Sequence, residues 1–129
     1  MPKILIVEDN RLSRQTLKSL FTSFLSTMIV EEAPNGREAM EKLASFHPDL
    51  VLMDVRLPDA SGMELTRKIK GKNPGVRVVI FTGHADSEYR EAAARYGADG
   101  FLVKGGSIQE ILALVESLLP ACEKEGAES

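Results

Sequence analysis

The stretch LVLMDVRLPDASG, residues 50–62, begins with four apolar residues and then reaches a carboxylate at Asp54. An unbroken apolar run of this kind is typical of a strand inside a parallel sheet, because both of its faces are covered. In open parallel sheets, functional residues gather at the carboxyl ends of the strands. The position of Asp54, at the end of a buried strand, therefore marks it as a candidate functional residue.

Five short apolar or β-branched runs alternate along the chain with five segments whose apolar residues recur three and four positions apart. Asn35, Ser61 and Ser107 each stand three residues before a Glu, which is the spacing of a capping box at a helix start. Gly97 stands where the fourth helix is expected to end in a left-handed residue. Strand–helix alternation of this kind predicts an α/β fold with a parallel sheet covered by helices on both faces. The expected strands are residues 4–7, 28–33, 50–53, 76–81 and 100–103.

Size and composition are those of one globular domain. Of the 129 residues, we expect 1–120 to form the domain and 121–129 to be a flexible tail or the start of a linker. The net charge is −3 and the basic residues are scattered, which disfavours a nucleic-acid surface. We find neither a signal peptide nor an apolar stretch of membrane-spanning length. The single Cys122 cannot form an internal disulfide, so a reducing, cytoplasmic setting is expected.

Polar residues follow four of the five expected strands. Because parallel strands end at the same edge of a sheet, we expect these side chains to form one cluster. Carboxylates about 4 Å apart repel by roughly 4 kcal/mol at an effective dielectric near 20, so such a cluster binds a proton or a cation. Oxygen ligands favour Mg²⁺, and no Cys/His set has the spacing of a zinc site. The cluster consists of Glu8-Asp9, Asp54, Thr82-Gly83 and Lys104.

These residue types are suited to reversible capture of a phosphoryl group. A carboxylate beside Mg²⁺ can act as a nucleophile toward phosphorus, which makes Asp54 the candidate acceptor. The metal and the Lys104 ammonium would neutralise the phosphoryl oxygens. Thr82 could donate a hydrogen bond to the captured group, and Gly83 has no side chain to obstruct its approach.

Four motifs in order resemble the receiver domains of two-component response regulators. They are ILIVEDN, DLVLMDVRLPDASGMEL, VVIFTGH and GADGFLVKG, and the resemblance runs from residue 3 to about residue 119. It implies a flavodoxin-like, doubly wound (βα)5 fold with a five-stranded parallel sheet in the order 2-1-3-4-5.

The resemblance also implies roles for the residues of the cluster. Asp54 matches the phosphoacceptor, and Glu8 and Asp9 match the acidic pair that binds Mg²⁺ together with it. Arg56 matches the position whose backbone carbonyl completes the metal site. Lys104 matches the lysine that contacts the phosphoryl group.

Further positions match the parts of the family that respond to phosphorylation. Thr82 matches the switch hydroxyl and Phe101 the aromatic residue that turns inward, while residues 86–119 match the surface that transmits the signal. The side chains of Arg56 and His84 match positions that can tune the lifetime of the phosphoryl group.

Two positions depart from the family pattern. The family usually has a cis proline after the lysine, whereas Gly105-Gly106 follows Lys104 here, so a trans bond and a more mobile loop are expected. Phe101 stands where the chemotaxis-type members have tyrosine, so any response that needs a hydroxyl there is lost.

The implied function is a phosphorylation-dependent signalling switch rather than a turnover enzyme. Its expected partners are a sensor histidine kinase and an output protein or linked domain, and GADGFLVKGGS resembles receivers joined to LuxR-type DNA-binding domains. No membrane or direct nucleic-acid contact is expected, and dimerisation on phosphorylation stays open. The kinase, its signal, and whether the domain stands alone also stay open.

Three alternative functions are disfavoured by the sequence. An aspartate-nucleophile phosphohydrolase is disfavoured because Arg56 stands where such enzymes need a second acid, two residues after the nucleophile. A flavodoxin is disfavoured because Glu8-Asp9 would repel the phosphate of a flavin. A receiver-like interaction module that never uses phosphate is disfavoured by the intact acceptor site.

Overall fold

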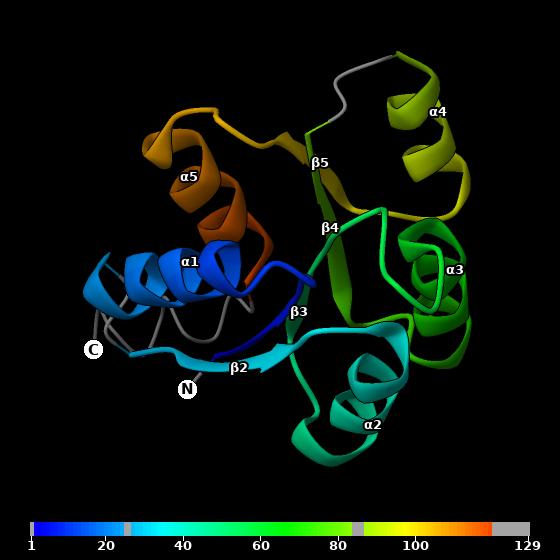
Figure 1. Ribbon diagram of the computed structural model, residues 1–129, viewed down its shortest axis with the longest axis horizontal. Coiled ribbons are helices and arrows are strands. Elements are labelled where there is room, and N and C mark those ends of the chain that lie inside the picture. Colours follow the sequence, from blue (N-terminus) through cyan, green and yellow to red (C-terminus); the bar gives the residue numbers. More distant parts are fainter. Residues whose placement is uncertain (1, 25–26, 84–86, 120–129) are drawn as a thin grey trace.

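The computed structural model describes residues 2–24, 27–83 and 87–119. Strands and helices alternate strictly, and all strands pair in parallel in the order β2-β1-β3-β4-β5, which confirms the expected topology (Figure 1). The elements are β1 (Lys3–Val7), α1 (Arg11–Phe24), β2 (Ile29–Ala33), α2 (Gly36–Phe46), β3 (Leu50–Met53), α3 (Gly62–Lys72), β4 (Arg77–Thr82), α4 (Ser87–Arg95), β5 (Gly100–Val103) and α5 (Ile108–Leu118).

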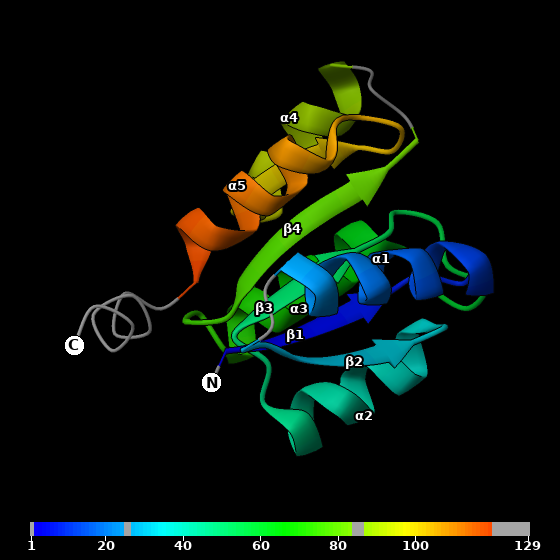
Figure 2. The same cartoon turned by 90° about the vertical axis from the view of Figure 1, so that its left-hand side faces the viewer.

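Two apolar cores lie on opposite faces of the sheet. Helices α1 and α5 cover one face and lie in front of it in Figure 2, whereas α2, α3 and α4 cover the other. Alternate residues of β1 and β3 enter alternate cores, so that Leu5 and Val51 pack on one side and Ile4 and Leu50 on the other. The central strands are covered on both faces, as the apolar run at residues 50–53 predicts.

Three strands differ from the predicted ranges at their ends. β1 begins at Lys3, one residue earlier than predicted. β2 begins at Ile29, whose N–H donates to the Pro2 carbonyl, so Met28 stays outside the strand. β4 begins at Arg77 and continues to Thr82. Val76 instead closes a turn by donating to the Asn73 carbonyl. Apolar character alone does not distinguish a half-buried turn residue such as Val76 from the first residue of a strand.

The three helix-start signals were correct in position, since Asn35, Ser61 and Ser107 are the N-cap residues of α2, α3 and α5. The Asn35 side chain accepts a hydrogen bond from the backbone N–H of Glu38, and the Ser107 side chain accepts one from the backbone N–H of Glu110. At Ser61 the helix starts as predicted, but the side chain makes no cap hydrogen bond, so the capping box itself is not formed there. Ser61 instead bridges Arg56 in the preceding turn.

Backbone geometry agrees with two further expectations. Gly97 has a φ of +96°, so α4 is followed by a left-handed residue as predicted. Within the described segments every peptide bond is trans, including the one after Lys104, and Gly105 has a φ of +87°. No helix among the described residues is long and apolar enough to cross a membrane. The predicted tail at 121–129 lies outside the described residues.

Candidate functional site

The polar strand ends meet in one pocket at the carboxyl edge of the sheet. Backbone pairing brings them there: Asp54 donates its N–H to the Val7 carbonyl at 3.0 Å, and Glu8 donates to the Ala33 carbonyl at 3.1 Å. The pocket has a volume of about 360 Å³. Its lining consists of Glu8, Asp9, Asn10, Ser13, Asp54, Arg56, Thr82, Gly83 and Lys104.

Three carboxylates converge in this pocket. One oxygen from each of Glu8, Asp9 and Asp54 lies within 4.8 Å of the others. Glu8 and Asp54 are buried, with 2% and 8% of their surfaces exposed, whereas Asp9 is exposed. The predicted acidic cluster is therefore present, and its mutual repulsion calls for a cation.

Lys104 supplies a positive charge to the cluster from the end of β5. Its backbone N–H donates to the Thr82 carbonyl, and its Nζ donates to Glu8 Oε1 at 2.5 Å and to Asp54 Oδ2 at 3.2 Å. Burial alone would lower the pKa of Lys104, but its hydrogen bonds to Glu8 and Asp54 and the charges of these carboxylates together outweigh burial and raise the pKa above its ordinary value. The ammonium therefore stays charged at neutral pH.

The turn after Asp54 closes one side of the pocket and is tightly packed. Gly62 donates its N–H to the Val55 carbonyl, and a Cβ at this glycine would lie 1.9 Å from the Asp54 carbonyl oxygen. Only glycine fits here. The Asp59 carboxylate reaches across from this turn to accept the N–H groups of Gly36 and Arg37 at the start of α2.

Of the other predicted site residues, two line the pocket and one lies outside it. Thr82 is buried, with 1% of its surface exposed, and lines the pocket at the end of β4. Arg56 lines the pocket too and is exposed. Phe101 lies outside the pocket, half-buried on the side of α4, where Arg90 stacks on its ring at 4.7 Å. His84 lies outside the described residues.

Sequence reasoning missed three residues around the acidic pair. Asn10 and Ser13 line the pocket, and the Asn10 side chain accepts the Ser13 N–H at the start of α1. The three-residue spacing of Asn10 and Ser13 could have indicated this cap. Arg14 donates to the backbone carbonyls of Glu8 and Asp9, and no local pattern predicts such a contact.

Comparison with known families identifies the family of the chain. The family model described as the response regulator receiver domain matches residues 4–116. The chain is a response regulator receiver domain.

Curated relatives of this receiver domain include the transcriptional regulatory protein LnrK of Bacillus subtilis, 37% identical over 89% of the chain. The response regulator GacA of Pseudomonas syringae pv. syringae is 31% identical over 87% of the chain. In each case the chain spans 52% of the relative, so the receiver domain corresponds to about half of a longer protein in these relatives.

Solved structures agree with the fold. The chemotaxis protein CheY4 of Vibrio cholerae is 26% identical with a TM-score of 0.84, over 92% of this chain and 99% of its own. A CheY-like receiver domain protein from Methanospirillum hungatei is 27% identical with a TM-score of 0.84, over 100% and 99%. The receiver domain thus belongs with the two-component response regulators, and its pocket fits a phosphoryl-accepting signalling switch.

Proposed function

We propose that Asp54 is the phosphoacceptor of this receiver domain and that a sensor histidine kinase is its phosphodonor. The observation that carries the proposal is the place of its carboxylate, at the end of β3 within 4.8 Å of two further carboxylates and in contact with the Lys104 ammonium. In the transfer, an Asp54 oxygen forms a bond to phosphorus while the phosphorus–nitrogen bond of the donor phosphohistidine breaks. The electron pair of that bond stays on the leaving imidazole.

The donor set around Asp54 fits Mg²⁺. Glu8, Asp9 and Asp54 offer oxygen ligands on one side of an open pocket, which leaves room for the waters that Mg²⁺ retains. These three side chains, with the backbone carbonyl of Arg56, would hold the ion. When bound, Mg²⁺ neutralises charge that builds up between the carboxylate and the phosphoryl oxygens.

Five residues complete the proposed switch. Lys104 exchanges a carboxylate partner for a phosphoryl oxygen, and Thr82 donates its hydroxyl to another. Phe101 then repacks against α4 and changes the α4–β5–α5 surface. The side chains of Arg56 and His84 tune the lifetime of the phosphoryl group.

The output is proposed from the relatives. LnrK is named a transcriptional regulatory protein, and the chain spans about half of it, which supports a linked output domain that regulates transcription. The resemblance of GADGFLVKGGS favours the LuxR type of DNA-binding domain for this output. In this proposal residues 1–120 form the receiver, 121–129 lead toward the output domain, and phosphorylation favours a dimer through the α4–β5–α5 surface. The receiver takes up and loses its phosphoryl group in the cytoplasm without turnover of a substrate.

Intact-mass spectrometry after incubation with acetyl phosphate tests the proposal. The expected result is a gain of about 80 Da, one phosphoryl group, that requires Mg²⁺ and is absent in Asp54→Asn. A folded sample that binds Mg²⁺ and gains no mass would favour an interaction module that does not use phosphate. Sustained release of inorganic phosphate over many turnovers would favour a phosphohydrolase.

A further inference from the structure

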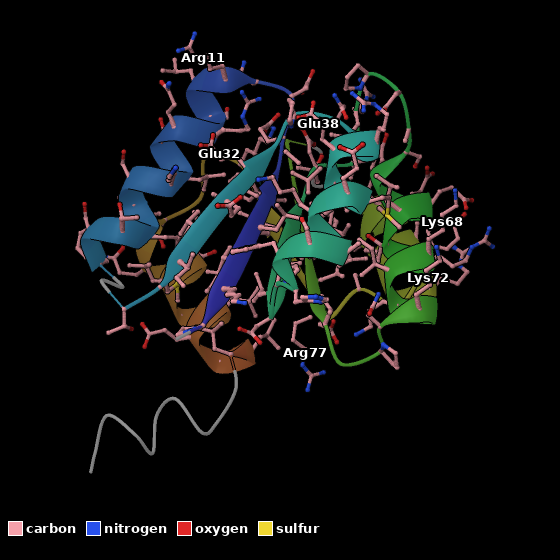
Figure 3. All side chains as sticks on the ribbon, turned by 90° about the horizontal axis from the view of Figure 1, so that it is seen from below. Arg11, Glu32, Glu38, Lys68, Lys72 and Arg77 are labelled. Atoms are coloured by element: carbon pink, nitrogen blue, oxygen red, sulfur yellow. The ribbon has the colours of Figure 1, made fainter. Side chains whose placement is uncertain are left out.

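Arg14 connects three parts of the chain behind the acidic pair. It lies in the first turn of α1 with 15% of its side chain exposed. Its Nη1 donates to the Glu8 carbonyl at 2.8 Å and to the Asp9 carbonyl at 3.2 Å. Its Nε donates to Glu32 Oε1 at 3.3 Å. Glu32 lies on the side of β2 that faces α1 (Figure 3).

These contacts hold the backbone rather than the carboxylates. Because a carbonyl oxygen lies in the plane of its peptide group, two bonds from one guanidinium orient the consecutive peptide groups after Glu8 and after Asp9. On the other side, the Glu8 N–H is bonded to Ala33, and the Asn10 N–H donates to Glu8 Oε2 at 3.0 Å. The segment that presents the acidic pair is therefore held from both sides.

A held backbone matters most for ligands of a hydrated ion. A flexible residue that must be ordered on binding loses backbone entropy, and a segment that is already ordered avoids this cost. Groups that orient metal ligands from behind typically change metal affinity by about 10–100-fold when they are removed. Arg14 has the geometry of such a group, and Glu32 holds the guanidinium in place.

We infer that Arg14 is a positioning residue for the divalent-cation site, acting through the backbone of Glu8 and Asp9. This inference rests on the proposed function, since it assumes that the acidic pocket binds Mg²⁺. The guanidinium is required as a fork, because a lysine amine is a single point donor that does not span Glu32 and two carbonyls. The positioning role therefore depends on the forked shape of the guanidinium as well as on its charge.

The test is the Mg²⁺ dissociation constant of the whole chain, measured from the shifts of backbone amide resonances in titrations with MgCl2. Arg14→Met, which keeps the aliphatic stem, is expected to weaken Mg²⁺ binding about tenfold, and Arg14→Lys to recover only part of the loss. Lys18→Met is the matched control. Lys18 pairs with the same Glu32 at 3.5 Å, and its replacement is expected to change affinity less than twofold.

Two results would overturn the inference. One is a folded Arg14→Met protein whose Mg²⁺ affinity stays within twofold of the natural chain, and the other is an equal loss in Lys18→Met. If Arg14→Met does not fold, Glu32→Ala serves instead, because it removes the acceptor of the Arg14 Nε–H and leaves the guanidinium. Its expected effect is a loss of about threefold or more, and unchanged affinity would refute the role.

The proposed function fails separately. If the natural chain shows no amide shifts in MgCl2 and gains no mass with acetyl phosphate, the phosphoryl switch is wrong and the positioning role has no metal to serve. If the natural chain binds Mg²⁺ and gains the mass, and the Arg14 variants bind Mg²⁺ equally well, the phosphoryl switch stands and the positioning role alone is wrong.

Discussion

Lys104 is the internal counter-ion of the pocket, and its replacement by methionine tests that role. Methionine keeps much of the length and the apolar stem of lysine but removes the ammonium that contacts Glu8 and Asp54. The three carboxylates are then left without this positive charge. We expect Lys104→Met to unfold more easily than the natural chain in the absence of Mg²⁺, and to regain most of the difference when Mg²⁺ is added.

The size of the effect follows from the geometry. Two unit charges at the 4.8 Å limit of this cluster repel by about 3.5 kcal/mol at an effective dielectric near 20. Removing one member of a buried ion pair typically costs about 3–5 kcal/mol. Because 30% of the Lys104 side chain is exposed, solvent screening reduces the expected loss to about 2–3 kcal/mol.

Urea denaturation followed by circular dichroism, with and without Mg²⁺, measures both parts of this prediction. A ligand at ten times its dissociation constant stabilises the folded state by about 1.4 kcal/mol, and the more negative variant pocket should gain more than this. Lys42→Met is the matched control, since its partner Glu31 is 37% exposed whereas Glu8 and Asp54 are buried, and its replacement should cost less than about 1 kcal/mol with no Mg²⁺ dependence. A Lys104→Met protein as stable as the natural chain without Mg²⁺, or a deficit that Mg²⁺ leaves unchanged, would refute the reasoning.

Three further substitutions test other parts of the account. Asp54→Asn should melt at or above the temperature of the natural chain without Mg²⁺, because it removes one of three mutually repelling carboxylates; a clear drop in Tm would contradict this. Burial raises the pKa of Asp99, but the hydrogen bonds from Lys70, the Val78 N–H and Arg77, with the charge of Lys70, together outweigh burial and lower the pKa below its ordinary value of 3.8. The ionised Asp99 therefore stabilises the fold above pH 3.8, and this stabilisation is lost as the pH falls through the folded-state pKa. Urea unfolding at stepped acidic pH should therefore show a shallower loss in Asp99→Asn than in the natural chain. Gly36→Ala should cost about 1–3 kcal/mol in the same assay, since its Cβ would lie 2.9 Å from a neighbouring side-chain carbon, whereas Gly71→Ala, which meets nothing within 4 Å, should not destabilise.

The topology and most of the pocket could be predicted because they depend on local patterns. Strands alternating with helices leave parallel pairing as the simple solution, and parallel pairing brings the residues after each strand to one edge. Asp54 and Lys104 are 50 residues apart and still hydrogen-bond, at the edge where the pattern placed them. Strand ends were less certain, since Val76 has the composition of a strand residue and lies in a turn.

The contacts that support the pocket could not be predicted in the same way. Arg14 acts on backbone carbonyls, which every residue has, so nothing in the sequence distinguishes its targets. Asp59 accepts N–H groups 22 and 23 residues earlier in the chain, and only the packed turn shows that α2 begins beside it. The missing cap hydrogen bond at Ser61 has the same origin, because the backbone of Ser61 pairs with that of Arg56 across the turn.

The most direct test of the central claim is to identify the residue that carries the phosphoryl group. After incubation with acetyl phosphate and Mg²⁺, borohydride reduces an aspartyl phosphate to homoserine, and peptide mass spectrometry locates the change. The account predicts homoserine at residue 54 alone, with the Lys104→Met protein modified at the same position. Modification at another carboxylate, or an unmodified Asp54 in a chain that has gained the phosphoryl mass, would contradict it.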